Sequence, residues 1–325
     1  MKAIVVEAPG AEDVLKIGEA PAPVLGPADV RIRVRATSVN RADLLQRQGM
    51  YPPPPGASPI IGLECAGEVT EVGAQVSGWK VGDRAMALLP GGGYAAEAVV
   101  HHGSAMHVPA ALSWEEAGAL PEVYLTSFLN IFLLGAIKPS GAALVHGGGS
   151  GVGTASINLL REAGMRSLVT AGSEEKCRRC RELGADFAIN YRDGEFAPKV
   201  REATGGHGVD VVLDSIGGKY LAGNIECLAV DGRLVIIGLI GGAKADINLA
   251  LLLLRRLQVI GSTLRTRSVG DKAEIVSRFL ERFGEALAAG RIKPVIDRVL
   301  PLEQAAEAHR VVQSSVHVGK VVLRV

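Results

Sequence analysis

The fold is decided at Leu144-Val145-His146-Gly147-Gly148-Gly149-Ser150-Gly151-Val152-Gly153-Thr154-Ala155, where an apolar run meets a glycine cluster and then a helical pattern. This layout lets a chain turn tightly off a strand and present unpaired N–H groups, at a helix N-terminus, to a diphosphate. The dinucleotide-binding pattern has glycines at i, i+2 and i+5, and a serine takes the middle position here. The alternative is a glycine-rich turn between packed elements. The candidate diphosphate-binding residues are Gly148, Ser150, Gly151, Val152 and Gly153.

The next β-rich run, Ser167–Ala171, bears on the cofactor. A ribose 2′-OH is usually held by an Asp or Glu about 20 residues past the glycines. That place reads Gly172-Ser173-Glu174-Glu175-Lys176. Gly172 leaves room for a 2′-phosphate, Ser173 can donate to it, and Lys176 adds positive charge. The pattern therefore favours NADPH over NADH, although two glutamates lie beside the site and Lys176 has the alternative of a solvated helix residue.

Strands and helices alternate after about residue 113, and this predicts a parallel sheet. Each later apolar run is short, as expected of strands buried on both faces. Six strands with helical crossovers make one doubly wound α/β domain. The four later strands are expected at Phe187–Ile189, Val211–Asp214, Leu234–Ile237 and Leu257–Ser262.

The segment before this domain reads as β-rich. Val30–Arg35 alternates apolar and basic residues, as a strand with one wet face does. Asn40–Gly49 reads as a capped helical turn ended by glycine, followed by a stiff proline loop after Tyr51. The tail after residue 265 is too small for a third domain, so we expect it to pack on the first.

Composition narrows the function classes. The chain has 325 residues, enough for two domains, and 35 basic residues balance 34 acidic ones for a net charge of +1. Nucleic-acid binding is therefore not expected. The N-terminal apolar run is too short for a signal peptide, and no stretch is long enough to cross a bilayer, which predicts a soluble cytoplasmic protein without a membrane partner.

Four scattered cysteines do not predict disulfides in such a chain. Cys177 and Cys180 form a C-x-x-C whose two intervening arginines would lower the thiol pKa values. A redox or metal role is the alternative to a structural one. No second C-x-x-C or nearby His cluster completes a zinc set.

Five regions together resemble a known family: residues 40–51, 81–84, 146–153, 189–191 and 319–323. Over essentially its whole length the chain is similar to the medium-chain dehydrogenase/reductase superfamily, and within it to the zinc-free quinone oxidoreductases related to zeta-crystallin. The resemblance implies a Rossmann doubly wound parallel sheet, a GroES-like β-rich catalytic domain and a cleft between them. We expect residues 1–120, completed by 265–325, to form the GroES-like domain and 121–264 the Rossmann domain.

The positions of the zinc ligands in related alcohol dehydrogenases test whether the chain resembles the zinc-free branch. Where the family pattern has Cys, His and Cys, this chain has Asn40, Leu63 and Glu122, so three zinc ligands cannot be assembled. Without a Lewis acid to polarise an alcohol, an acceptor that already takes hydride readily is the better hypothesis. Quinones and conjugated carbonyls are such small-molecule acceptors.

The resemblance also implies roles for individual residues. Asn40 and Thr126 would border the nicotinamide, and Tyr191 with Lys176 would hold the adenosine 2′-phosphate. Tyr51 and Gln48 would line the acceptor pocket, and Tyr51 could hydrogen-bond the developing oxyanion or pass it a proton, as solvent could also do. The alternatives are a helix cap for Asn40 and a packing residue for Tyr51. In the connection after the last Rossmann strand, the backbone at Leu264 or the Arg265 side chain would reach the cofactor.

Three functions follow as hypotheses. The leading one is an NADPH-dependent quinone reductase that passes hydride directly to a quinone. The second sends hydride to the β-carbon of an α,β-unsaturated ketone or aldehyde. The third, of another class, is a nucleotide-binding sensor or structural protein with little turnover. The resemblance implies a homodimer joined through the strand near Leu257–Ser262, and the apolar Leu249–Ile260 fits a buried interface and a core equally.

Overall fold

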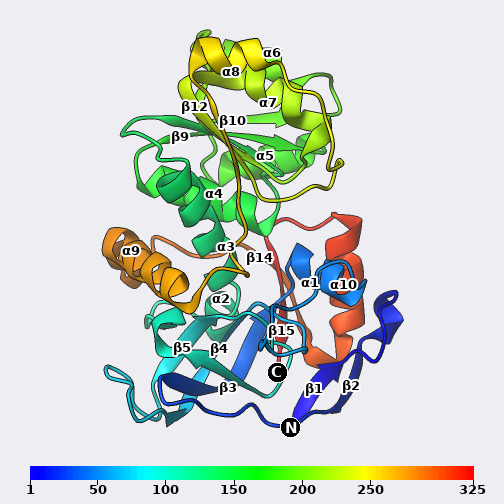
Figure 1. Cartoon of the computed structure of the whole chain (residues 1–325), viewed down its shortest axis with the longest axis vertical. Coiled ribbons are helices and arrows are strands. Elements are labelled where there is room, and N and C mark those ends of the chain that lie inside the picture. Colours follow the sequence, from blue (N-terminus) through cyan, green and yellow to red (C-terminus); the bar gives the residue numbers. More distant parts are fainter. The chain divides into compact units, whose positions relative to one another are not determined.

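The computed structural model describes all residues, 1–325, and divides into two compact units: residues 1–125 with 264–325, and residues 126–263 (Figure 1). No helix is both long enough and apolar enough to span a membrane.

The second unit is a six-stranded parallel sheet with the order β10-β9-β8-β11-β12-β13. Counted along the chain this order is 3-2-1-4-5-6, the doubly wound arrangement of dinucleotide-binding domains. The predicted Rossmann sheet is therefore confirmed. Its strands are β8 (Ala142–His146), β9 (Arg166–Ala171), β10 (Phe187–Asn190), β11 (Val209–Asp214), β12 (Leu228–Ile236) and β13 (Gln258–Gly261).

Helices connect these strands, as the apolar runs predicted. The central strand β8 is buried along its whole length, which explains its continuous apolar sequence. The helices are α4 (Gly151–Glu162), α5 (Glu174–Glu182), α6 (Phe196–Ala203), α7 (Leu221–Cys227) and α8 (Leu249–Arg255), with a π-helical turn η3 (Phe128–Leu134) and a 3₁₀ turn η4 (Gly218–Tyr220).

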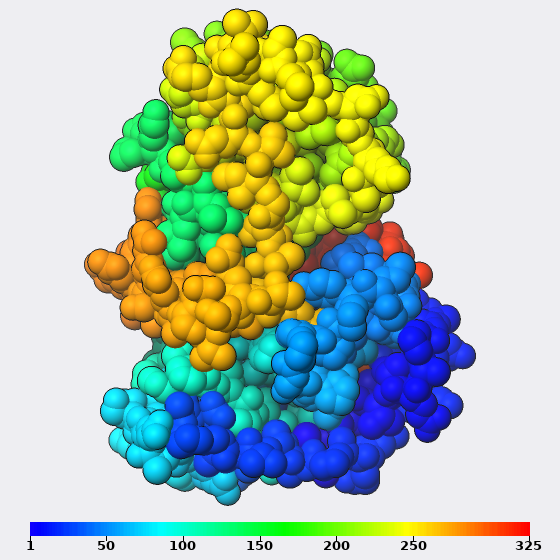
Figure 2. Space-filling model, viewed as in Figure 1, coloured from blue at the N-terminus to red at the C-terminus, as the bar shows by residue number.

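The leucine-rich segment is divided between the surface and the core: Leu251 and Leu252 are half-buried and pack against the core of the second unit. Leu249, Leu253 and Leu254 of α8 are 68%, 78% and 73% exposed. Next along the chain, β13 is the last strand of the sheet, so one of its edges is unpaired, and its Val259 is 41% exposed. The atoms near residue 250, yellow in Figure 2, lie on the surface. A core role is therefore wrong for Leu249, Leu253 and Leu254 alone.

The first unit is β-rich and contains a seven-stranded sheet. Its centre is β3 (Asp29–Ser38), which buries Val30, Ile32 and Val34 on one face as the alternating pattern predicted. The order is β14-β15-β3-β4-β5-β7, with β6 also on β3, and β1 and β2 form a separate pair. The strands are β1 (Lys2–Val5), β2 (Lys16–Glu19), β4 (Glu64–Val72), β5 (Arg84–Leu88), β6 (Glu97–His101), β7 (Ala105–His107), β14 (Ile296–Pro301) and β15 (Lys320–Arg324).

The helices of this unit come from both ends of the chain. The predicted GroES-like domain is confirmed by this mixed sheet together with the family match reported below. The helices are α1 (Arg41–Arg47), α2 (Trp114–Ala117), α3 (Pro121–Ser127, whose last two residues belong to the second unit), α9 (Val269–Ala288) and α10 (Ala305–Ser314), with 3₁₀ turns η1 (Glu12–Val14), η2 (His102–Ser104) and η5 (Leu302–Gln304).

The C-terminal strand is an integral part of the first unit. β15 pairs antiparallel with β3, placing Val322 opposite Ser38 and Leu323 opposite Thr37. Leu323 is fully buried in a cluster with Ile4, Val39 and other apolar side chains. The tail therefore supplies an internal strand of the sheet, between β14 and β3.

Replacing Leu323 with Ala is expected to destabilise the protein by about 2–5 kcal/mol, because it leaves a cavity in this cluster. The neighbouring Arg324 makes only an exposed ion pair with Glu115, so Arg324→Ala is the matched control and should cost about 0–1 kcal/mol. Urea unfolding measures both. Equal effects of the two variants would contradict the burial of this strand.

Candidate functional site

The glycine cluster forms a tight turn at the carboxyl end of β8. Gly147 has a positive φ of 74°, and Ser150 is the N-cap of α4, where its Oγ accepts a hydrogen bond from Gly153 N at 3.0 Å. The serine in the middle of the pattern thus orders the helix start, and its hydroxyl hydrogen is not used in that bond. A Cβ at Gly153 would lie 2.3 Å from the Gly147 carbonyl oxygen. Only glycine fits there. Because no side chain stands at this position, the N–H groups of the turn stay accessible.

A buried polar chain supports this turn from behind. The Gly147 N–H points at Thr170 Oγ1 (3.4 Å), which lies 3.0 Å from His146 Nδ1. His146 Nε2 lies 2.6 Å from Asn224 Oδ1, and Asn224 Nδ2 donates to Asp214 Oδ2 at 3.0 Å. Because Asn224 uses its amide nitrogen toward Asp214, its oxygen must accept, and His146 therefore carries its proton on Nε2. Burial lowers the pKa of His146 to about 4, which keeps this ring neutral.

At the end of β9, the Tyr191 hydroxyl packs closely against Gly172. A Cβ at Gly172 would lie 2.5 Å from the Tyr191 hydroxyl oxygen, so a larger residue would displace this half-exposed tyrosine. Ser173 is the N-cap of α5, and its Oγ accepts from Lys176 N at 3.3 Å. The structure thus brings the predicted residues Gly172, Ser173, Lys176 and Tyr191 to one end of the sheet.

The two glutamates beside this region are neutralised by arginines of their own helix. Glu175 forms an ion pair with Arg178 at 2.6 Å, and Glu174 pairs with Arg181. No carboxylate stands at the end of β9, and both nearby glutamates are paired with arginines. The two glutamates in the sequence are therefore not an argument against a phosphate in this region.

In the first unit, a buried carboxylate lies at the start of β4. Glu64 is fully buried, and its Oε1 accepts hydrogen bonds from Ser38 Oγ at 2.6 Å and Lys320 Nζ at 2.9 Å. Its Oε2 accepts from the backbone N of Glu122 at 2.9 Å. The ammonium of Lys320, itself only 2% exposed, balances the Glu64 charge. A buried ion pair with this many hydrogen bonds is stable, whereas either charge alone would be very costly.

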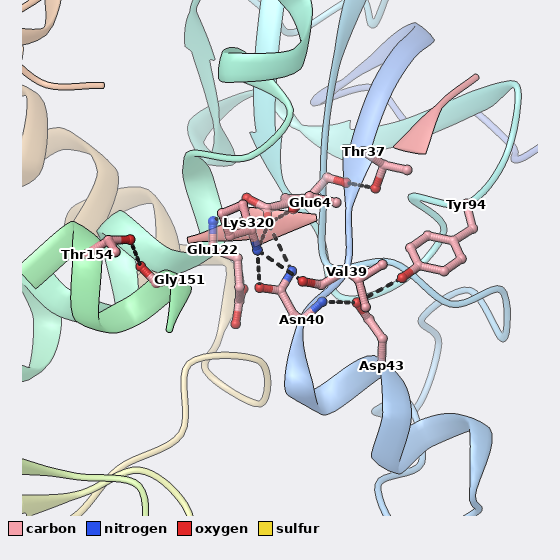
Figure 3. Close-up of polar contacts among 11 residues, drawn as sticks. Thr37, Val39, Asn40, Asp43, Glu64, Tyr94, Glu122, Gly151, Thr154 and Lys320 are labelled. Atoms are coloured by element: carbon pink, nitrogen blue, oxygen red, sulfur yellow. Dashed lines mark hydrogen bonds and ion pairs between the residues drawn. The ribbon is translucent and has the colours of Figure 1, made fainter. Parts of the chain in front are cut away.

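Asn40 is held by this ion pair (Figure 3). Its Oδ1 accepts from Lys320 Nζ at 2.6 Å, and its Nδ2 donates to Glu64 Oε1 at 2.9 Å. Asn40 is also the N-cap residue of α1, as the capping alternative expected, and its backbone N donates to Asp43 Oδ2 at 2.7 Å. The cap and the side-chain contacts are therefore compatible.

A second buried chain fixes Asp43. Tyr94 Oη donates to Asp43 Oδ2 at 3.3 Å and lies 3.1 Å from His309 Nε2. His309 Nδ1 faces the Arg47 guanidinium at 3.4 Å, so Nδ1 accepts and Nε2 carries the proton. Burial lowers the pKa of His309 to about 3, and burial raises the pKa of Asp43 to about 7. The start of α1 is thus anchored through side chains of α10 and of the segment before β6.

Glu122 lies beside Asn40 and Lys320 in Figure 3. Burial and the nearby Glu64 carboxylate raise the pKa of Glu122 to about 8. Its carboxyl group is therefore mostly protonated at neutral pH, and it can donate a hydrogen bond or a proton. Sequence reasoning treated Glu122 only as a missing zinc ligand.

Arg265 holds the loop that carries Tyr51. Its Nε donates to the Pro90 carbonyl oxygen at 2.8 Å, and its two terminal nitrogens donate to Tyr51 O at 3.2 Å and Gln46 Oε1 at 2.7 Å. The guanidinium carbon also lies 5.2 Å from the centre of the Tyr51 ring. Burial raises the pKa of Tyr51, with Glu122 adding to the shift. The structure thus uses Arg265 to order Tyr51, whereas sequence reasoning assigned Arg265 only a contact to the cofactor.

The remaining predicted residues are Gln48, Thr126 and Leu264. Gln48 borders a shallow hollow with Pro9, Glu12 and Arg47, whereas Gln46 contacts Arg265. Thr126 is buried on α3, where its carbonyl oxygen accepts from Asn130, and Leu264 is buried next to Arg265.

Sequence reasoning assigned no role to Lys320, Glu64 or Gln46. For Lys320 and Glu64 a signal exists in the sequence: each is a charged residue in an otherwise apolar strand segment, Gly319–Leu323 and Leu63–Ala66. A buried charge needs a partner. Nothing in the sequence distinguishes Gln46.

The C-x-x-C pair is buried on α5. The pKa of Cys180 is raised to about 11, mainly by burial, and the pKa of Cys177 is raised for the same reason. Thiols that stay protonated are poor nucleophiles. This favours a structural role for the pair.

Zinc does not fit these residues. No group of three or more His, Cys, Asp or Glu side chains is arranged to hold a metal ion. The cation at the centre of the first unit's polar cluster is the Lys320 ammonium.

Gly153→Ala is expected to weaken NADPH binding about tenfold or more while the protein still folds, because the new Cβ displaces the turn. Fluorescence titration with NADPH and far-ultraviolet circular dichroism measure the two properties. Gly284→Ala, in open space on α9, is the control for exchanging a glycine. Unchanged affinity in the Gly153 variant would contradict the assignment of this turn.

Glu122→Gln is expected to gain stability relative to the native protein as the pH rises. The carboxyl has an unfolded pKa of about 4.3 and a folded pKa of about 8, so folding the charged form costs more and more between these values. The difference in unfolding free energy should grow by on the order of 3–4 kcal/mol from pH 5 to pH 8 in urea titrations. Glu115, whose pKa is lowered in the folded state, is the control with the opposite sign. A flat difference for Glu122→Gln would show that its carboxyl is ionised throughout.

Two family models match the chain. The alcohol dehydrogenase GroES-like domain matches residues 26–120, and the zinc-binding dehydrogenase model matches residues 183–323. Among curated relatives, a quinone oxidoreductase of Rattus norvegicus is 30% identical, with 99% of this chain and 97% of that protein covered. The synaptic vesicle membrane protein VAT-1 homolog of the same species is 32% identical, with 99% and 84% covered.

Other relatives are much longer than this chain. A mycocerosic acid synthase-like polyketide synthase of Mycobacterium tuberculosis is 34% identical over 92% of this chain. The chain spans only 14% of the length of the polyketide synthases that it matches.

Solved structures share the whole fold. A quinone oxidoreductase of Escherichia coli complexed with NADPH has a TM-score of 0.87 at 28% identity, with 100% of both chains covered. The CurK enoyl reductase has a TM-score of 0.87 at 28% identity, with 99% of this chain and 98% of that one covered. The predicted resemblance is confirmed: the chain belongs to the medium-chain dehydrogenase/reductase superfamily, with quinone oxidoreductases among its relatives.

Proposed function

We propose that the protein is an NADPH-dependent quinone reductase that transfers hydride directly to its acceptor without a metal. The observation that carries this proposal is the cluster of buried Asn40, Lys320 and Glu64 with the half-buried Glu122. It offers hydrogen-bond donors and no metal-ligand set, which suits a carbonyl oxygen that gains negative charge. An acceptor that takes hydride readily needs orientation more than a Lewis acid.

The second unit binds the cofactor in this proposal. Gly148, Ser150, Gly151, Val152 and Gly153 receive the diphosphate, and the groups at Gly172, Ser173, Lys176 and Tyr191 receive the 2′-phosphate end. The bound cofactor supplies the hydride. The NADPH complex of the Escherichia coli relative supports this choice of cofactor.

The first unit receives the acceptor. Hydride addition to a quinone leaves an oxyanion that must take up one proton to give the hydroquinone. Glu122 holds a proton near neutral pH, whereas the raised pKa of Tyr51 makes this hydroxyl the weaker acid. We assign proton delivery to Glu122 and contact with the acceptor to Tyr51 and Asn40. Asn40 and Thr126 border the nicotinamide. Gln48 and Leu264 lie farther from the reacting atoms.

The rival function is reduction of an α,β-unsaturated carbonyl double bond. Its support is the likeness to the CurK enoyl reductase. Both functions use a carbonyl oxygen that becomes an oxyanion, so the same donors serve both. A low-turnover NADPH sensor is the remaining hypothesis.

One assay distinguishes the three candidate functions. NADPH oxidation is followed by absorbance with a panel of small quinones and a panel of enones, with NADH and added zinc as controls. Turnover with quinones and NADPH, without a need for zinc, supports the proposal. Turnover with enones alone overturns it in favour of double-bond reduction, and NADPH binding without turnover on either panel favours the sensor.

A homodimer is part of the proposal. The unpaired edge of β13 and the exposed leucines of α8 form a continuous stretch of chain, Leu249–Gly261, that a second copy can cover. Sedimentation equilibrium measures the mass in solution, and a monomer at all concentrations would refute this assembly.

Lys176→Ala is expected to weaken NADPH binding about tenfold while leaving NADH binding nearly unchanged, since a charge-assisted hydrogen bond to phosphate is lost. Arg178→Ala is the matched control, because it removes another cation of the same helix, one that forms ion pairs with Glu175 and Glu182. Fluorescence titration gives the dissociation constants of both cofactors for the native protein and the two variants. Equal loss for both cofactors would contradict a 2′-phosphate contact.

A further inference from the structure

The carboxamide of Asn40 has only one orientation available to it. Lys320 can only donate hydrogen bonds, so the Asn40 oxygen must face Lys320 Nζ, 2.6 Å away. Glu64, when ionised, can only accept, so the Asn40 nitrogen must face Glu64 Oε1, 2.9 Å away. A flipped amide would set donor against donor and acceptor against acceptor. The ion pair therefore distinguishes the two ends of the amide group.

This orientation engages both the oxygen and the nitrogen of the side chain. Both the oxygen and one Nδ2 hydrogen are engaged on the ion pair, and Asn40 is only 8% exposed. The second Nδ2 hydrogen has no acceptor among the contacts of the structure. Asn40 therefore has one Nδ2 hydrogen left to donate.

The ion pair itself has no freedom to turn away. The three ammonium hydrogens of Lys320 are directed at Asn40 Oδ1, at Glu64 Oε1 and, at 3.3 Å, at the Val39 carbonyl oxygen. Glu64 is fixed in turn by Ser38 Oγ and the Glu122 backbone N–H. Neither charge is exposed to water that could replace these contacts.

We propose that Lys320 and Glu64 are positioning residues that lock the Asn40 carboxamide, so that its free Nδ2 hydrogen is donated to the carbonyl oxygen of the acceptor. This inference rests on the proposed function and adds a substrate class to it: the acceptor must bring an oxygen with a free lone pair to Asn40. As negative charge develops on that oxygen, the preset donor stabilises it without having to reorient.

Three variants test the proposal. Asn40→Asp retains an oxygen for Lys320 and a side chain that caps helices well, but it cannot donate at a pH where the new carboxyl is ionised. The double variant Lys320→Met with Glu64→Gln removes both buried charges together, which avoids leaving one unpaired, and it frees the amide to flip. Lys320→Arg keeps the cation. Arg324→Gln, on the same strand and exposed, is the control.

The activity of each variant is measured by steady-state kinetics, with a quinone that the native protein reduces. We expect kcat to fall about 100-fold in Asn40→Asp and about tenfold or more in the double variant. In the double variant the dissociation constant of NADPH should be unchanged. Lys320→Arg should retain more activity than the double variant. A folded double variant with native kcat would overturn the positioning role, and native kcat in Asn40→Asp would overturn the donor role.

A separate readout distinguishes this proposal from the proposed function. The two side-chain amide protons of Asn40 are observed by ¹⁵N NMR. Their chemical-shift separation should be wider in the native protein than in an exposed asparagine, because only one of them is bonded to a carboxylate, and it should shrink in the double variant. If the native protein reduces no quinone but the wide separation is found, the proposed function fails while the locked amide stands. If the separation is that of an exposed asparagine, the locked amide fails whatever the activity.

Discussion

The buried ion pair between Lys320 and Glu64 is the contact on which the candidate site depends. The two residues are 256 positions apart in the chain, and they meet only when β15 closes the sheet beside β3. Each charge would be costly alone in this interior, so the pair forms together with the fold of the first unit. Asn40, at the first turn of α1, takes its orientation from it.

The second unit also depends on a fixed local geometry. The turn after β8 is set by the backbone, since a side chain at Gly153 would collide with the Gly147 carbonyl oxygen. The neutral His146 behind it connects three neighbouring strands through Thr170, Asn224 and Asp214. Both units thus present fixed N–H donors: backbone groups in the second unit and one amide hydrogen in the first.

Much of this fold could be predicted because local patterns determine it. The glycine spacing and the short apolar runs predicted the strands of the parallel sheet, and the alternation at Val30–Arg35 predicted β3. The Lys320–Glu64 contact could not be predicted, since no local pattern records a contact across the chain. Gln46 in α1 and Gln48, the residue just after its end, show the limit of such local prediction. Residues two positions apart point about 200° apart around a helix, which is why Gln46 and not Gln48 contacts Arg265.

The most direct test of a locked, donating Asn40 is the ¹⁵N NMR spectrum of its side chain, recorded with NADP⁺ and then with a quinone analogue that cannot be reduced. We expect two well-separated amide protons, of which the one bound to Glu64 stays in place and the other moves when the analogue binds. A shift of the Glu64-bound proton alone, or of neither proton, would contradict the role of Asn40 as the preset donor.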